Sequence, residues 1–261
     1  KKLSQSVEGW IVMLDHVEGR SFNRGDSTGL FQWLNALQQA NYRTVVLPMQ
    51  IDLKLPDDVK LIVMASPLKT FSADELAWLQ QQVDKGISLM WLADPNSALN
   101  QPGLSLLFDV MRTDAYHQGH LIIKNYNDHP INQSFDRPLD LVDVLPYISS
   151  DEVLWQNQQG ETLASTREVS TSRFMVIGDS DFLSDSHLNS GGNLEMSFRL
   201  LDWLLYHENR IDLPSIGTSG TQLHYDKNEI LLFAGLMLIV IPFALLLVAG
   251  FYWRKNKVKQ G

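Results

Sequence analysis

The stretch L-I-V-M-A-S-P-L-K-T-F-S-A-D-E-L-A-W-L-Q-Q-Q-V-D-K-G-I-S-L-M-W-L-A-D-P, residues 61–95, decides the fold. Its two apolar runs, 61–65 and 87–92, have strand length and are typical of strands buried on both faces. Between them, Ser72 and Glu75 form a capping box that predicts a helix start. Strand, helix and strand in this order predict a pair of parallel strands joined by a crossover helix.

The same alternation extends in both directions along the chain. Apolar runs at 10–14, 45–47 and 174–177 predict further buried strands. Apolar residues at helical spacing follow residue 30 and residue 193, where Asp26 or Ser27 and then Asn193 are the expected N-caps. A short helix is expected to run through Met111. We therefore predict an α/β fold with a largely parallel sheet flanked by helices.

Residues 117–169 follow a looser pattern. Short apolar runs at 121–123, 139–145 and 153–155 predict shorter, antiparallel strands or edge additions to the sheet. Trp33, Trp78 and Trp203 lie at helical spacing and are expected in the core, whereas Trp155 is a candidate for an exposed aromatic.

The last part of the chain predicts a membrane anchor. Residues 230–252 contain no ionisable side chain, and four basic residues follow them. A helix of about 20 residues crosses a bilayer, so we expect residues 229–253 to span one, with the basic tail 254–261 in the cytoplasm. Pro242 is expected to kink this helix, and Gly235 and Gly250 are small enough for close packing against another helix.

This orientation places residues 1–210 outside the cytoplasm as one α/β domain, with residues 211–228 as a linker rich in Gly, Ser and Thr. We expect a bacterial inner-membrane protein whose domain lies in the periplasm. Because residues 1–5 are polar, an export signal or a membrane helix is expected to precede Lys1 in the natural protein.

The charge and the absence of cysteine exclude several kinds of function. The chain has a net charge of -9; removing the +4 of the tail and the -1 of Glu229 leaves residues 1–228 at -12. An acidic domain repels nucleic acid, so we expect no nucleic-acid partner. With no cysteine, the chain has neither a thiolate nucleophile nor a disulfide.

Acidic residues follow three of the predicted strands. Asp15, with His16 beside it, follows the first, Asp94 follows the fourth, and Asp179 and Asp181 follow the run 174–177. Because parallel strands end at one edge of a sheet, these carboxylates are expected to converge, where they could bind a hard cation or a polar partner group. The alternative is that each one caps a helix or closes a turn.

Catalytic and cofactor motifs have little support. The seven histidines lack zinc-binding H-E-x-x-H spacing, and Gly178-Asp-Ser-Asp181 lacks the second glycine of a nucleophile elbow. No nucleotide-binding glycine loop is present. We therefore assign no catalytic residue, no metal and no cofactor. Asp15, His16, Asp94, Asp179, Asp181 and Asn193 are candidates for binding or interface residues.

Several blocks resemble the gliding-motility-type auxiliary component of ABC transporters. These are F-M-V-I-G-D-S-D-F-L-S-D-S-H-L-N-S-G-G-N-L-E at 174–195, M-W-L-A-D-P at 90–95, I-D-L-P at 211–214, and the apolar segment with its basic tail. The resemblance covers nearly the whole chain. It implies an extracytoplasmic domain of glutamine-amidotransferase-like, Rossmann-like fold that works beside an ABC permease and ATPase. Amidotransferase chemistry requires a cysteine, which this chain lacks.

The leading hypothesis is a non-catalytic auxiliary subunit of an ABC-type export or gliding-motility-like complex. Its outer domain would bind substrate or an extracytoplasmic protein, and its membrane helix would lie in lipid against the permease. The first alternative is a membrane-tethered hydrolase or metal-dependent enzyme that uses the strand-end aspartates. The second is a structural scaffold in which Gly178, Gly191 and Gly192 only permit tight turns.

Overall fold

The computed structural model describes residues 9–15, 19–23, 25–50, 53–95 and 101–207. The chain divides into two compact units, 1–211 and 212–261, and all described residues belong to the first. The predicted linker, membrane helix and basic tail lie outside the described residues, as do Gly235, Pro242 and Gly250. Within the described part, no helix is both long and apolar enough to cross a bilayer.

A nine-stranded sheet forms the centre of the domain, in the order β2-β1-β3-β4-β11-β10-β8-β5, with β9 also paired to β10. A separate two-stranded sheet joins β6 and β7. The strands are β1 (Trp10–Asp15), β2 (Arg43–Pro48), β3 (Val59–Ala65), β4 (Ser88–Leu92), β5 (Val110–Arg112), β6 (His117–Ile123), β7 (Leu139–Val144), β8 (Tyr147–Ser149), β9 (Glu152–Gln156), β10 (Thr162–Val169) and β11 (Ser172–Ile177).

Five neighbouring strands of the large sheet, from β2 to β11, are parallel. The remaining strands pair antiparallel to one another and to β11. The predicted α/β fold with a mostly parallel sheet is therefore confirmed, and so are the antiparallel additions in the looser region.

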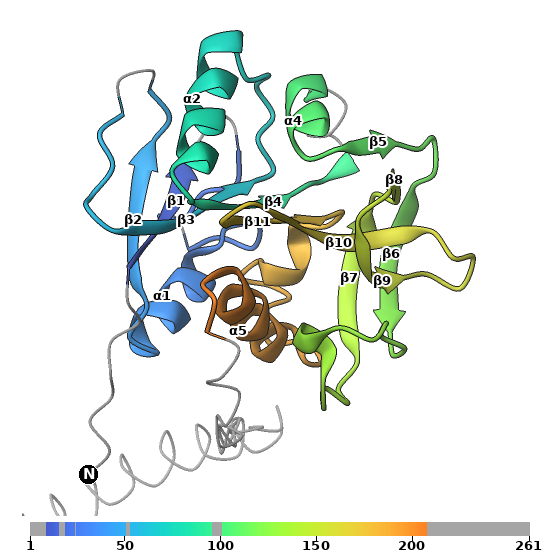
Figure 1. The fold of residues 1–261 in the computed structure, drawn as a ribbon. Coiled ribbons are helices and arrows are strands. Elements are labelled where there is room, and N and C mark those ends of the chain that lie inside the picture. The colour runs from blue at the N-terminus through green and yellow to red at the C-terminus, as the bar shows by residue number, and fades with distance from the viewer. Residues whose placement is uncertain (1–8, 16–18, 24, 51–52, 96–100, 208–261) are drawn as a thin grey trace, which may run out of the picture. The chain divides into compact units, whose positions relative to one another are not determined.

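Helices cover both faces of the sheet (Figure 1). They are α1 (Phe31–Gln39), α2 (Ala73–Asp84), α4 (Pro102–Leu107) and α5 (Asn193–Leu204), with 3-10 turns at η1 (Pro130–Asn132) and η2 (Asp181–Leu183). Successive residues of β1 point to opposite faces of the sheet. Ile11 packs in the core beneath α1 and α5, whereas Val12 packs in the core beneath α2 and α4. A strand with helices on both faces must be apolar throughout, as the sequence is.

Several local predictions are settled by the structure. The capping box is present, since the Ser72 hydroxyl accepts from the Glu75 amide and the Glu75 carboxylate accepts from the Ser72 amide. Trp33, Trp78 and Trp203 are buried as expected. Trp155 is not exposed but fully buried, where it packs edge-on against Phe182.

Other predictions of helix ends are wrong. Helix α1 begins after Leu30, so neither Asp26 nor Ser27 caps it, and Asp26 instead closes a turn with Thr28. Helix α5 begins at Asn193 itself, with Gly192 in the N-cap position. Met111 belongs to strand β5 rather than to a helix. In each case tertiary contacts, which sequence spacing does not report, place the helix end.

Candidate functional site

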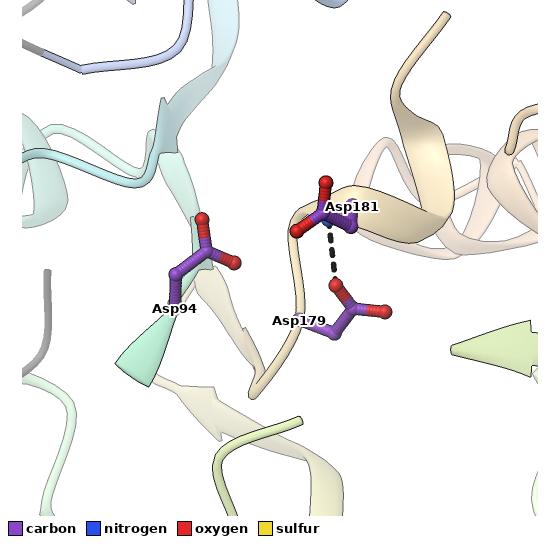
Figure 2. A group of neighbouring side chains, drawn as sticks. All are labelled: Asp94, Asp179 and Asp181. Carbon is purple, nitrogen blue, oxygen red and sulfur yellow. Dashed lines mark hydrogen bonds between the residues drawn. The ribbon is translucent and has the colours of Figure 1, made fainter. Parts of the chain in front are cut away.

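Three of the predicted strand-end carboxylates converge at the carboxyl edge of the parallel strands (Figure 2). Asp94 follows β4, while Asp179 and Asp181 follow β11, and these two strands are paired neighbours. One carboxylate oxygen from each residue lies within 4.8 Å of the other two. The predicted convergence is confirmed for these three residues, and it follows from parallel strands ending at one edge.

Arg20, in the loop after β1, is the cation of this cluster. Its Nη2 atom lies 3.2 Å from Asp94 Oδ2 and 2.5 Å from Asp181 Oδ2. Its Nε atom donates to the Ser180 hydroxyl, and its Nη1 atom donates to the Thr28 carbonyl at 2.9 Å. One guanidinium thus neutralises two carboxylates from two different strands.

Ser180 is held by the same network. Its hydroxyl donates to Asp94 Oδ2 at 2.6 Å, and its amide donates to Asp94 Oδ1 at 2.8 Å. Both carboxylate oxygens of Asp94 therefore have donors. The Ser180 hydroxyl is fully buried and oriented by an acid and a guanidinium, so its proton belongs to a structural bond.

Asp179 is fully buried and accepts from two backbone amides. Its Oδ2 accepts from the Val142 amide at 2.8 Å, which ties β7 to the end of β11, and its Oδ1 accepts from the Asp181 amide at 2.6 Å. Burial, and next the nearby charge of Asp94, raise the pKa of Asp179 well above its ordinary value.

Burial and neighbouring charges have opposing effects on the pKa values of Asp181 and Arg20. Burial raises the pKa of Asp181, although the charge of Arg20 opposes the rise. Burial alone would lower the pKa of Arg20, but Asp94 and Asp181 outweigh it and raise that pKa. The arginine therefore stays charged and acts as a fixed counter-ion.

The other predicted site residues do not join this cluster. Asp15 ends β1 but is not among the converging carboxylates, and His16 lies outside the described residues. Asn193 is fully buried; its Oδ1 accepts from the Asp140 amide, and its amide group donates to the carbonyls of Asp140, Phe182 and His187. Asn193 thus joins β7 to the segment after β11, which is a structural role.

Gly178 explains why the G-D-S-D turn begins with glycine. A Cβ atom at this position would lie 2.0 Å from the Leu145 carbonyl oxygen. The Leu145 amide donates to the Gly178 carbonyl at 2.7 Å, so the two backbones touch directly. Glycine is needed for this close approach, which brings the residues after β7 against the acidic turn.

A pocket of about 610 Å³, which we call the carboxyl-edge pocket, opens over the cluster. Arg20, Asp94 and Asp181 lie in its lining, and Asp143, Tyr116 and Arg112 come from β7 and from the end of β5 with its following connection. Sequence reasoning missed Arg20 and these last three residues. Arg20 lies in a loop without periodicity. Tyr116 comes from the connection between β5 and β6, and Asp143 from β7, so only the tertiary fold brings them to the site.

A second cavity of about 420 Å³ lies at the opposite end of β11. Its lining includes His129, Glu168, Arg173 and Trp203. Arg173 donates to Glu168 at 2.8 Å, to the Trp203 carbonyl at 2.5 Å, and stacks over the rings of Trp203 and Tyr206. Burial lowers the pKa of His129, whose Nδ1 accepts from the Ile131 amide.

Comparison with known proteins identifies similar folds but no protein family. No protein-family model and no curated protein matches the chain. Among solved structures, the N-terminal domain of mmIFT52 is 14% identical with a TM-score of 0.64, and the match covers 75% of this chain and 97% of that one.

Two further structures share the fold. A Thermoplasma acidophilum protein described as part of a GMP synthase is 11% identical, with a TM-score of 0.52 and coverage of 78% of this chain and 97% of that chain. The exo-β-1,4-mannosidase Op5Man5 from Opitutaceae bacterium strain TAV5 is 17% identical, with a TM-score of 0.50 and coverage of 75% and 35%. These proteins differ widely in what they do, so the likeness extends to the fold and not to function.

Proposed function

We propose that the chain is a non-catalytic auxiliary subunit of an ABC-type transport complex, of export or gliding-motility type. In this proposal the α/β domain binds substrate or a partner protein in the carboxyl-edge pocket. Residues 229–253 dock on the permease in a bacterial inner membrane, with the domain on the periplasmic side. An ABC permease and its ATPase are the partners.

The observation that carries the non-catalytic part is the closed network around Arg20. A catalytic carboxylate or nucleophile must be able to change its partner during a reaction cycle. Here both carboxylate oxygens of Asp94 accept hydrogen bonds from Ser180 or Arg20, and both oxygens of Asp179 accept from backbone amides. The groups that sequence reasoning offers for catalysis are therefore committed to holding the turn after β11 against β4.

An amidotransferase-like fold without its nucleophile supports the same conclusion. We assign this finer fold type from the sequence resemblance, and the parallel sheet with helices on both faces is compatible with it. The chain contains no cysteine, so thiolate chemistry is excluded. The hydroxyl of Ser180 faces Asp94 and Arg20 rather than a histidine base among the described residues.

The membrane part of the proposal is supported by the sequence. Residues 230–252 lack ionisable side chains and precede a basic tail, which is the pattern of a span with a cytoplasmic end. The resemblance to ABC-transporter auxiliary components covers this segment as well as the acidic turn.

Co-purification of the full chain from mild detergent tests the proposal. We expect an ABC permease and an ATPase, identified by mass spectrometry, to accompany the tagged protein. Replacing Gly235 and Gly250 with leucine should reduce their recovery while membrane insertion is retained, because bulk at close helix contacts weakens packing. The matched control is Val240→Leu with Val248→Leu, which adds bulk at larger residues. Recovery of neither partner with the unaltered chain would contradict the proposal.

A metal-dependent enzyme is the second candidate, because the oxygen atoms of three carboxylates converge within 4.8 Å. Three carboxylates are a suitable ligand set for Mg²⁺ or Mn²⁺. In that case a metal ion would compete with Arg20 for Asp94 and Asp181. Metal titration with variants of the three aspartates separates the two candidates.

A further inference from the structure

The lining of the carboxyl-edge pocket contains both acidic and basic side chains, which restricts the chemical class of ligand that it can bind. Four aspartates, Asp26, Asp94, Asp143 and Asp181, lie there together with the cations Arg20 and Arg112. Formally the charged lining is negative by two, which disfavours an anionic ligand. The volume of about 610 Å³ is that of an ordinary small-molecule site.

The carboxylates of the lining already hold donors. Asp94 and Asp181 hold Arg20, as described above. Asp26 accepts from the amide of Thr28 at 3.1 Å and from its hydroxyl at 3.0 Å. Asp143 accepts from the Gly119 amide at 2.7 Å, and Tyr116 lies with it in the lining. Each of these four carboxylates therefore already accepts a hydrogen bond or pairs with Arg20.

Acceptors and donors consequently alternate around the pocket. A carboxylate oxygen that holds one donor retains a further lone pair, and the neighbouring guanidinium or hydroxyl can donate in turn. A ligand that only donates, such as an ammonium group, or only accepts, such as a phosphate, uses half of such a surface. A hydroxyl group both donates and accepts, so adjacent hydroxyls fit the alternation.

Tyr116 adds an apolar face beside these polar groups. Tyr116 is 50% exposed, so part of its ring is open to a ligand in the pocket. An aromatic ring in the lining of a polar pocket offers a flat surface for the C–H face of a ring-shaped ligand. Asp143 has φ of 54° and lies on β7 where the pairing with β6 shifts register.

We propose that this pocket binds a neutral saccharide, with its hydroxyls on the Asp143, Asp181 and Arg112 side and a sugar ring against Tyr116. The inference rests on the proposed function in one respect, namely that this edge binds a ligand rather than catalysing a reaction. It adds the chemical class of the substrate.

Binding of disaccharides to the full chain in detergent tests this inference. Maltose, cellobiose and chitobiose are titrated by saturation-transfer NMR and calorimetry, with spermidine as a cationic probe and inorganic phosphate as an anionic one. We expect at least one disaccharide to bind saturably and neither charged probe to do so. Tyr116→Ala should weaken binding about fivefold, since the packing of the sugar against the aromatic ring is lost. Asp143→Asn should also weaken it.

The control is Tyr206→Ala, which removes another exposed tyrosine, close to the second cavity. It should leave disaccharide affinity unchanged. Failure of all three sugars to bind would overturn the inference, and so would saccharide binding that survives both pocket substitutions. Spermidine binding that is lost in Asp143→Asn would instead assign the pocket to cations. Each of these failures leaves co-purification with a permease unaffected, so the proposed function is judged separately.

Discussion

Two arginines at opposite ends of β11 bring buried charge into the domain in different ways. Arg20, at the carboxyl edge, lies between Asp94 and Asp181, whose side chains are only 11% and 20% exposed. Arg173, at the amino end, pairs with Glu168, whose side chain is 61% exposed, and also contacts aromatic rings and a carbonyl. The first arginine neutralises buried acids, whereas the second fixes the end of α5 against the sheet.

The two arginines stabilise the two ends of the sheet by different interactions. Acids buried with their own counter-ion form a rigid pocket floor that does not need a ligand to be stable. An arginine stacked on aromatic rings stabilises mainly through packing and can lose its acidic partner to water at little cost. Removing each arginine should therefore have unequal consequences.

Arg20→Met should have the largest effect. It leaves Asp94 and Asp181 close together without their counter-ion, and breaking a buried ion pair costs about 3–5 kcal/mol. We expect a loss of this size in the free energy of unfolding from urea titration at pH 7. Arg20→Lys, which keeps the charge but not the fork of donors, should lose less. A loss below about 1 kcal/mol for Arg20→Met would show that the network contributes little.

Arg173→Met should cost about 1–3 kcal/mol in the same measurement, because hydrogen bonds and ring stacking are lost but Glu168 remains hydrated. The loss should become smaller as the salt concentration rises, since the charge of Glu168 is exposed and its attraction to Arg173 is screened by salt. A cost equal to that of Arg20→Met would remove the distinction between the two ends.

Combining Arg20→Met with Asp181→Asn should restore about 1–2 kcal/mol relative to Arg20→Met alone. The double variant removes one of the acids that the arginine neutralises, so the two changes are coupled rather than additive. Asp57→Asn, an exposed acid far from the cluster in sequence, is the matched control and should restore nothing. Strict additivity with Asp181→Asn would mean that charge neutralisation is not what Arg20 provides.

The pH dependence of stability should reveal Asp179. Its folded pKa is raised, so its contribution to stability is complete below the unfolded pKa of about 3.9 and is lost as pH rises through the folded pKa. The free energy of unfolding should fall over this range by up to about 1.4 kcal/mol per pH unit. Asp179→Asn should flatten this decline, whereas Asp57→Asn should not. An equal slope in both variants would contradict the assigned shift.

The sequence predicts the central sheet and the helices that cover it better than it predicts the site. Runs such as 61–65 and 174–177 are apolar at every position, and burial on both faces of a parallel sheet is the reason. Strand β10 was missed because its sequence T-L-A-S-T-R-E-V mixes small, polar and apolar residues. Its first five residues are nevertheless buried, and it pairs with β11 along one edge and with β8 and β9 along the other.

The convergence of Asp94, Asp179 and Asp181 could be predicted, because all three follow the ends of neighbouring strands. Their counter-ion, Arg20, could not be predicted. Arg20 meets Asp94 and Ser180 across 74 and 160 residues of sequence. No local pattern carries such a contact. The role of Asn193 was missed for the same reason, since its amide bonds β7 rather than the helix that it begins.

Binding of Mn²⁺ to the full-length protein tests most directly whether Arg20 or a metal ion holds the strand-end carboxylates. Titration at pH 7, followed by electron paramagnetic resonance, should show no saturable site with a Kd below about 1 mM, a weak affinity even for carboxylate metal sites. A site of about 100 µM or tighter, abolished by Asp179→Asn and Asp181→Asn but kept in Asp57→Asn, would contradict the non-catalytic account and favour the metal-dependent enzyme.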